Sequence, residues 1–191
     1  MPYKIPRQKL ENGSLKIYEK VKKNNIYFMT VDVSRGKGMD YSAFSIFDCT
    51  ETPYKQVVTF RSNEIPPMVF PTVINRMSDV YNEALILVEI NDVGQQVSDI
   101  LYHDLENVNL ISISSDNRKG QSISGGFGGS NKSLGIRTTK ATKKIGCMNL
   151  KSLIEEDKLY IRDYETINEL TSFVQKGPKF EAERGRNDDL V

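Results

Sequence analysis

Short β-prone runs dominate the chain from residue 26 onward. Residues 27–33 (YFMTVDV), 42–48 and 56–61 are apolar runs separated by turn-forming segments. Runs with this spacing predict three consecutive strands of an antiparallel meander. The preceding residues 1–25 are polar and weakly patterned, so we expect a lead-in segment with one short strand near residues 15–18.

The middle of the chain alternates between strand and helix patterns. The proline pair at 66–67 opens an amphipathic segment that predicts a helix to about residue 81. The apolar run 84–90 (ALILVEI) is typical of a central strand that is covered on both faces. A helix over 93–103 and a strand over 108–113 are expected next. This order of elements implies an α/β fold with parallel crossovers.

The last third begins with the least regular part of the chain. Residues 114–139 are rich in glycine, serine and cations, and we expect a flexible loop or loose hairpin there. An amphipathic pattern predicts a long helix over 140–156, followed by a short strand over 159–162. Residues 167–174 are expected to be helical. A polar, basic segment then leads to the closing sequence Asp188-Asp189-Leu190-Val191.

Composition bounds the chemistry that the chain can perform. With 191 residues, 38% hydrophobic and 27% charged, the chain suits one soluble domain in the cytoplasm. Its one histidine, His103, excludes any mechanism that needs two histidines, and its two cysteines lack the CxxC spacing of zinc sites. The segment GGFGGSNKS lacks the glycine that a P-loop requires before Lys132, so no ATP site is expected. Acidic residues must therefore provide any metal ligands.

Four acidic residues stand in unusual places. Asp32 lies inside an apolar strand, Glu89 ends the run ALILVEI, and Asp188 and Asp189 close the chain beside two apolar residues. A buried charge is costly unless it is paired or binds a metal. The carboxyl end of a central parallel strand is also where α/β folds place ligand sites. Converging carboxylates favour Mg²⁺ or Mn²⁺, which prefer oxygen ligands.

Each acid also has a purely structural explanation. Asp32 could pair with Arg35, Glu89 could cap the following helix together with Asn91, and Asp188 could be a helix N-cap. All three explanations would have to hold independently. The combination therefore favours a metal site.

Basic residues cluster although the formal net charge is only +1. A local positive potential can attract phosphates even when the total charge is near zero. A charge run is usually only a solvated face, and this explanation stays open here. The alternative is a phosphate-binding surface that contains Arg35, Lys37, Arg118, Lys119, Lys132, Arg137, Lys140, Lys143 and Lys144.

Four segments together carry a family resemblance. YFMTVDVSRGKGMDYSAFSIFD, ALILVEINDVGQQVSDIL, TKATKKIGCMNLKSLIEEDKLYI and NDDLV occur in this order. The chain thereby resembles the C-terminal nuclease domain of the large terminase subunit of tailed bacteriophages, most closely the T-even type. The similarity covers about residues 14–191.

The resemblance implies a fold and a set of site residues. The fold would be ribonuclease H-like: a central mixed sheet with an antiparallel meander, then parallel strands, and helices on both faces. Asp32 matches the first catalytic aspartate, Glu89 the second acid and the Asp188-Asp189 pair the third, with Asp189 preferred. Asp40 matches an accessory acid.

The resemblance also implies the activity. Members of the family cut concatemeric double-stranded DNA during genome packaging and use divalent metal. We expect two-metal hydrolysis of a phosphodiester, with Asp32 bridging two Mg²⁺ or Mn²⁺ ions about 3.5–4 Å apart. Because phosphate contacts carry no sequence information, cutting should be largely non-specific. The alternatives are a junction resolvase or transposase-like nuclease of the same fold, and a catalytically idle DNA-binding or motor-docking module.

The biological setting follows from the same resemblance. The large subunit carries an N-terminal ATPase domain, and this chain has no Walker A signature. We therefore expect residues 1–25 to be the linker from that domain and residues 26–191 to be the nuclease domain. The expected partners are double-stranded DNA, the ATPase domain, the portal and the small terminase subunit, in the host cell cytoplasm and without a membrane.

Overall fold

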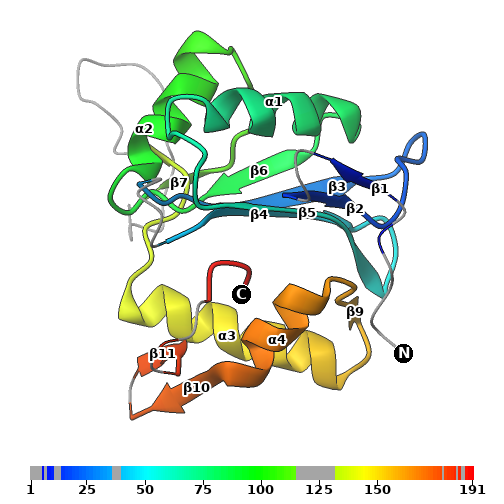
Figure 1. Cartoon of the computed structure of the whole chain (residues 1–191), viewed down its shortest axis with the longest axis vertical. Helices are drawn as coiled ribbons and strands as arrows, with labels where there is room; N and C mark the ends of the chain where they lie inside the picture. Colours follow the sequence, from blue (N-terminus) through cyan, green and yellow to red (C-terminus); the bar gives the residue numbers. More distant parts are fainter. Residues whose placement is uncertain are drawn as a thin grey trace, which may run out of the picture.

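A mixed β-sheet lies between two layers of helices (Figure 1). The computed structural model describes residues 6, 8–10, 14–35, 40–114, 132–177, 179–183, 185 and 188–191. The strand order in the main sheet is β1-β2-β5-β4-β3-β6, with β9 paired to β5. The α/β fold with helices on both faces, expected from the sequence, is confirmed.

The antiparallel meander forms the middle of the sheet. It consists of β3 (Tyr27–Asp32), β4 (Ser42–Asp48) and β5 (Tyr54–Ser62), and both of its pairings are antiparallel. The first two strands match the sequence prediction to within one residue, and β5 is longer than predicted.

Strand β6 (Leu85–Val88) extends the sheet beyond β3 in parallel orientation. The prediction of a central strand buried on both faces is wrong: β6 is the last strand of the main sheet, and Leu85 is 44% exposed. Beyond β6, the described residues pair only through isolated parallel bridges from Ile86 to Leu110 and from Glu89 to Ile136. The apolar run arises because one face packs on helices and the other faces a cavity.

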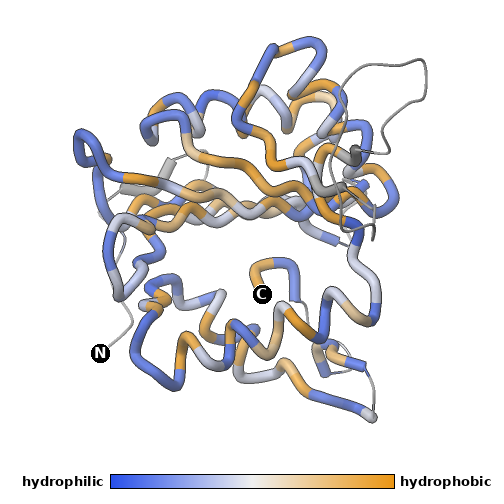
Figure 2. The backbone as a smooth tube through the Cα atoms, turned by 180° about the vertical axis from the view of Figure 1, so that it is seen from behind, coloured by the Kyte–Doolittle hydropathy of each residue, from blue (hydrophilic) through white to orange (hydrophobic). Residues whose placement is uncertain are grey.

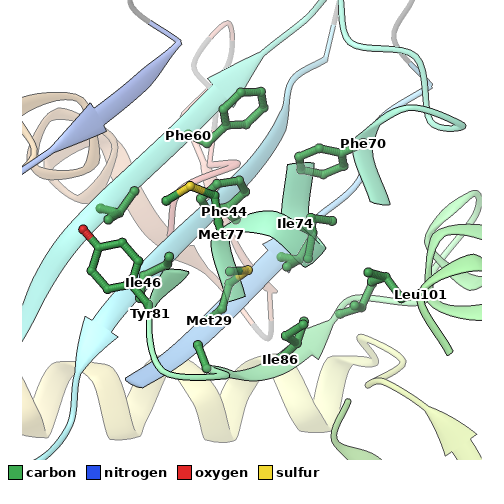
Figure 3. Packing of buried hydrophobic residues seen from close by; sticks show 14 of the residues in the cluster. Met29, Phe44, Ile46, Phe60, Phe70, Ile74, Met77, Tyr81, Ile86 and Leu101 are labelled. Atoms are coloured by element: carbon green, nitrogen blue, oxygen red, sulfur yellow. The ribbon is translucent and has the colours of Figure 1, made fainter. Parts of the chain in front are cut away.

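The hydrophobic core lies on one face of the sheet. Helix α1 (Phe70–Val80), helix α2 (Gly94–Asp99) and the π-helical turn η2 (Ile100–Asp104) cover this face. Figure 3 shows strand residues packed against side chains of α1 and η2; the residues labelled there are Met29, Phe44, Ile46, Phe60, Phe70, Ile74, Met77, Tyr81, Ile86 and Leu101. Helix α1 begins later than predicted, because the backbone N–H groups of Val69 and Phe70 first close a turn onto Pro66.

Helices α3 (Lys140–Glu155) and α4 (Tyr164–Ser172) form the second layer. The prediction of α3 is confirmed, and Thr139 and Thr142 form a capping box at its start. This helix has no fully buried residue. Figure 2 shows the C-terminus between this layer and the sheet.

The N-terminal segment takes part in the main sheet. Strands β1 (Gln8–Leu10) and β2 (Leu15–Ile17) pair with each other, and β2 pairs with β5. The hydroxyl of the buried Tyr18 donates to Asp163 at 2.5 Å, and Lys16 lies 3.1 Å from the same carboxylate. The described part of the expected lead-in thus joins the sheet to α4, and its strand at β2 is confirmed.

The remaining strands are short. Strand β9 (Leu159–Tyr160) runs parallel to β5. The strand predicted over 108–113 is displaced: β7 (Ser112–Ser114) pairs with β8 (Lys132–Leu134) at the base of the expected hairpin. Residues 115–131, most of the glycine-rich loop, lie outside the described residues.

The helix predicted over 167–174 differs at both ends. It begins at Tyr164, where Asp163 caps it, and it ends at Ser172. Strand β10 (Phe173–Lys176) then pairs with β11 (Lys179–Ala182). None of the described helices combines the length and apolar character needed to cross a bilayer.

Candidate functional site

Two of the predicted acids lie at the same level of neighbouring parallel strands. Asp32 is the last residue of β3, and Glu89 directly follows β6. The register pairs Val31 with Val88, and the backbone N–H of Glu89 donates to the carbonyl of Val31 at 2.9 Å. Because side chains alternate between faces, both acids point to the face away from the core. This is the carboxyl edge at which parallel strands present ligands.

The turn after Glu89 is held by a close backbone approach. A Cβ atom at Gly94 would lie 1.9 Å from the carbonyl oxygen of Glu89, so only glycine fits at this position. The side chain of Asn91 donates to Glu89 Oε1 at 2.8 Å and to the Thr138 carbonyl at 3.2 Å. The structural explanation that Glu89 caps the following helix with Asn91 is wrong: the N-cap of α2 is Val93, which has no side-chain cap hydrogen bond, and Asn91 contacts Glu89 without capping the helix.

The C-terminal acids reach the same region from the far end of the chain. Figure 1 shows the C-terminal segment between the sheet and the α3–α4 layer. Lys143 Nζ lies 3.0 Å from Asp188 Oδ2, and Arg61 Nη2 lies 3.2 Å from Asp189 Oδ2. The third acid position is therefore occupied by two carboxylates that are each paired with a cation.

The electrostatics of Asp32 reflect its burial and its acidic neighbours. Burial, the largest cause, and the charges of Glu89, Asp189 and Asp188 together raise the pKa of Asp32 to about 7, against a hydrogen bond from the Val33 backbone. Among the described residues, none of the ion pairs involves Asp32. The explanation that paired Asp32 with Arg35 is wrong, because Arg35 contacts both carboxylate oxygens of Asp92 at 2.5 Å.

Two charged residues of the site were not predicted from the sequence. Arg61, on β5, lies 3.1 Å from Glu169 Oε1 on α4. Burial raises the pKa of Glu169, although the Leu190 N–H and Arg61 favour its charged form. A signal was present in the sequence: Glu169 lies three residues after Thr166, a helical spacing that places both residues on the buried side of α4.

Burial also raises the pKa of Asp189. The contact with Arg61 counteracts this effect, while Asp188 and Asp40 add to it. The predicted accessory acid Asp40 therefore acts electrostatically on the site although its own side chain is exposed.

A cavity of about 610 Å³ separates the sheet from the second helical layer. The acids Asp32, Glu89, Asp188 and Asp189 line it together with apolar side chains of the strands and of α3. The acids are thus reached from a hollow and are not sealed in the core.

The chemistry of the donor set fits a hard divalent cation, since it consists of carboxylate oxygens. As the side chains stand, however, no three acidic, histidine or cysteine residues in the described part of the chain could hold one ion. In this arrangement Asp188 is paired with Lys143 and Asp189 is paired with Arg61.

The predicted phosphate-binding residues fall into three groups. Arg137, three residues before α3, and Lys140 and Lys144, in its first turns, are exposed. Lys143 and Arg35 are instead engaged by Asp188 and Asp92. The side chains of Lys37, Arg118, Lys119 and Lys132 lie outside the described part of the structure. His103, to which no role was assigned, is exposed on η2.

Comparisons with known proteins agree with this fold. Residues 29–191 match a family model described as the terminase RNaseH-like domain. The crystal structure of the large terminase nuclease from thermophilic phage G20c matches with a TM-score of 0.71 at 18% identity, over 98% of this chain and 88% of that one. Its magnesium-bound form matches with a TM-score of 0.73 at 18% identity, over 98% and 87% of the two chains.

A second phage provides an independent match. The large terminase nuclease domain of Thermus phage P74-26 has a TM-score of 0.67 at 19% identity, over 100% of this chain and 84% of that one. At these identities the solved structures establish a shared fold, whereas the family model covers most of the sequence. The chain therefore belongs to the terminase RNase H-like domain family.

Proposed function

We propose that this domain is a metal-dependent endonuclease that cuts concatemeric double-stranded viral DNA during genome packaging. The observation that supports it most is that Asp32, Glu89, Asp188 and Asp189 line one cavity, where burial and the three neighbouring acids raise the pKa of Asp32 to about 7. Mutual repulsion of this kind is costly to a fold, and a divalent cation relieves it. The magnesium-bound G20c nuclease has the same fold.

In the proposed site, Asp32, Glu89 and Asp189 hold two Mg²⁺ or Mn²⁺ ions, with Asp188 beside them and Asp40 as an accessory charge. When bound, divalent ions supply an activated water at neutral pH and neutralise charge on the scissile phosphate. The protein groups provide the framework: the β3–β6 ladder sets the level of Asp32 and Glu89, and Asn91 orients Glu89.

Duplex DNA would be bound through its phosphates. Arg137, Lys140 and Lys144 form an exposed basic start to α3, on the helix that also carries Lys143 toward the acids. Contacts to phosphates carry no sequence information, so the proposed cutting is largely non-specific. Arg35, Lys37, Arg118, Lys119 and Lys132 belong to the same proposed surface.

The setting of this activity is also a proposal. By family membership, the domain would work beside the ATPase domain of a full-length large subunit, with residues 1–25 connecting the two. The portal and the small terminase subunit would be further partners, in the host cell cytoplasm.

A plasmid-nicking experiment tests the proposal. Supercoiled plasmid, linear duplex and a four-way junction are incubated with the protein and either Mg²⁺ or Mn²⁺, using wild type, Asp32→Asn and Asp79→Asn. Asp79 is exposed on α1 and serves as a matched control. We expect wild type and Asp79→Asn to cut both duplexes, and Asp32→Asn to be inactive. Full activity of Asp32→Asn refutes the assignment, and cutting of the junction alone favours a resolvase.

One observation favours a second function, a DNA-binding or motor-docking module without catalysis. Asp188 and Asp189 are already paired with Lys143 and Arg61, and within the described ranges no three potential ligands could hold one ion as the side chains stand. Calorimetric titration of wild type and Glu89→Ala with Mn²⁺ separates the two functions. The nuclease binds Mn²⁺ and loses affinity on this substitution, whereas an idle module binds none.

A further inference from the structure

Asp32 and Arg61 lie at the same level of the main sheet, on strands separated by β4. Asp32 pairs in register with Ala43 on β4, and Ala43 pairs with Arg61 on β5. Residues paired in register project to the same face of a sheet. Ala43 lies between the acid and the arginine in this register, and its side chain is a single methyl group. Asp32, Ala43 and Asp189 all line the cavity at this level.

Arg61 contacts Tyr41 and Glu169 in addition to Asp189. Its guanidinium group lies 3.8 Å from the centroid of the Tyr41 ring, and Nη2 lies 3.1 Å from Glu169 Oε1. The same nitrogen lies 3.2 Å from Asp189 Oδ2. The side chains of Arg61, Glu169 and Asp189 are 19%, 6% and 15% exposed, so this contact is largely shielded from solvent.

Glu169 also holds the segment that carries Asp189. Its second oxygen, Oε2, accepts a hydrogen bond from the backbone N–H of Leu190 at 2.8 Å. Arg61 thus contacts the side chain of Asp189, and Glu169 accepts a hydrogen bond from the backbone of the next residue, Leu190. Helix α4 and strand β5 together determine where the third acid lies.

The charges explain why an arginine can stand beside a metal ligand. Alone, Arg61 would compete with a cation for Asp189. Glu169 offsets the charge of Arg61, so the three groups together keep one negative charge. Arg61 contacts Oδ2 of Asp189, and Oδ1 takes no part in the ion pair. Lys143 contrasts with this arrangement, because among the described residues Asp188 is the one acid that pairs with it.

We propose that Arg61 and Glu169 are positioning residues, which orient Asp189 for divalent-metal binding while Glu169 keeps Arg61 from displacing the ion. This inference rests on the proposed function and deepens it. The competing explanation is purely structural: the pair would only fasten α4 and the C-terminal segment to the sheet. In variants whose stability is unchanged, a positioning role predicts weaker metal binding, whereas a purely structural role predicts unchanged metal binding.

The test is Mn²⁺ titration by calorimetry, with thermal unfolding of each metal-free variant as the stability measure. Glu169→Gln keeps an acceptor for the Leu190 N–H but removes the charge that offsets Arg61. Arg61→Lys keeps the charge but loses the planar fork. The double variant Arg61→Met/Glu169→Gln removes both charges of this pair, so that neither Arg61 nor Glu169 is left as a buried charge without the other. Arg76→Met and Glu64→Gln are exposed controls.

Residues that orient metal ligands typically contribute about 10- to 100-fold to metal affinity. We expect Glu169→Gln, Arg61→Lys and the double variant each to weaken Mn²⁺ binding by about tenfold or more, and the controls by less than about twofold. In an Asp189→Asn background, Glu169→Gln should have almost no further effect, because the ligand that it orients is gone.

Several results would overturn the inference. Affinity within about twofold of wild type in both single variants would leave the pair a purely structural role, as the 10- to 100-fold range would not be met. Tighter Mn²⁺ binding by the double variant would make Arg61 a competitor and not a positioning residue. An undiminished effect of Glu169→Gln in the Asp189→Asn background would show that Glu169 does not act through Asp189.

The same experiment separates failure of this inference from failure of the proposed function. If wild type binds no Mn²⁺, both fail. If wild type binds Mn²⁺ and cuts DNA while the variants match it, the inference alone fails.

Discussion

The ammonium group of Lys143 lies 3.0 Å from the Oδ2 atom of Asp188, so that a predicted metal ligand is already paired with a cation of the protein. Both side chains are about one-third exposed, at 37% and 33%, and exposed ion pairs of this kind contribute little to stability. The contact therefore matters for charge at the acid cluster more than for the fold.

Lys143→Gln should tighten Mn²⁺ binding by a few fold, because it removes a cation that occupies Asp188. Lys144→Gln, on the exposed side of the same helix, should leave the affinity unchanged. Calorimetry on the two variants measures the difference. Weaker binding by Lys143→Gln would mean that the lysine orients Asp188 and does not compete for it.

Asp32→Asn should stabilise the metal-free protein at neutral pH. The pKa of Asp32 rises from 3.8 to about 7 on folding, because burial and the neighbouring acids disfavour its charged form. A raised carboxyl pKa leaves stability intact below pH of about 4 and removes it progressively as the pH rises to about 7. At one pKa unit per 1.36 kcal/mol, the full penalty is on the order of 4 kcal/mol.

Chemical denaturation of both proteins between pH 4 and pH 8, in the presence of a chelator, measures this effect. The unfolding free energy of wild type should fall relative to that of Asp32→Asn across this interval. Parallel pH profiles for the two proteins would contradict the raised pKa.

Asp163→Asn should destabilise the fold by about 3 kcal/mol, since it breaks a buried, charge-assisted network. Burial raises the pKa of Asp163, but the bonds from Tyr18 and the Thr166 backbone and the nearby Lys16 outweigh burial and hold the pKa below its ordinary value. This contribution to stability is therefore present at neutral pH and is lost as the pH falls below about 4.

Urea unfolding at pH 7 tests the network, with Asp157→Asn as the control. Asp157 is exposed and has a φ of 55°, a conformation that asparagine tolerates. Equal midpoints for Asp163→Asn and wild type would show that the N-terminal segment does not depend on this carboxylate.

Neutralising Lys140 and Lys144 together should weaken duplex binding at all sequences. Each lost phosphate contact removes about one unit from the slope of log K against log salt, so the double variant should show a slope smaller by up to about two. Binding is measured with Ca²⁺ in place of Mg²⁺ over a series of salt concentrations. An unchanged slope would exclude the start of α3 from the DNA surface.

The position of Asp32 could be predicted because the local sequence is nearly sufficient. Asp32 lies inside the apolar run 27–33, which predicts a strand, and Glu89 lies near the end of a second such run, 84–90. To predict that the two acids are adjacent required one further assumption, that their strands are parallel neighbours in an α/β sheet. The structural explanation for Asp32, an ion pair with Arg35, could be tested only from contacts in the structure. Those contacts show that Arg35 pairs with Asp92.

The roles of Arg61 and Glu169 depend on tertiary packing that local patterns do not contain. Arg61 reaches the site through the β4–β5 register, and Glu169 through the placement of α4 against the sheet. The end of α4 was missed for a different reason. The Gly-Pro dipeptide at 177–178 signals a turn, and the β-prone residues Phe173 and Val174 before it pair as a strand instead of continuing the helix.

The most direct test of the metal site is anomalous diffraction from crystals of this domain soaked in Mn²⁺. We predict anomalous peaks within about 2.0–2.3 Å of carboxylate oxygens of Asp32, Glu89 and Asp189, and their loss in Asp32→Asn crystals. Peaks elsewhere on the molecule, or no peak beside Asp32 in wild-type crystals that contain Mn²⁺, would contradict the account.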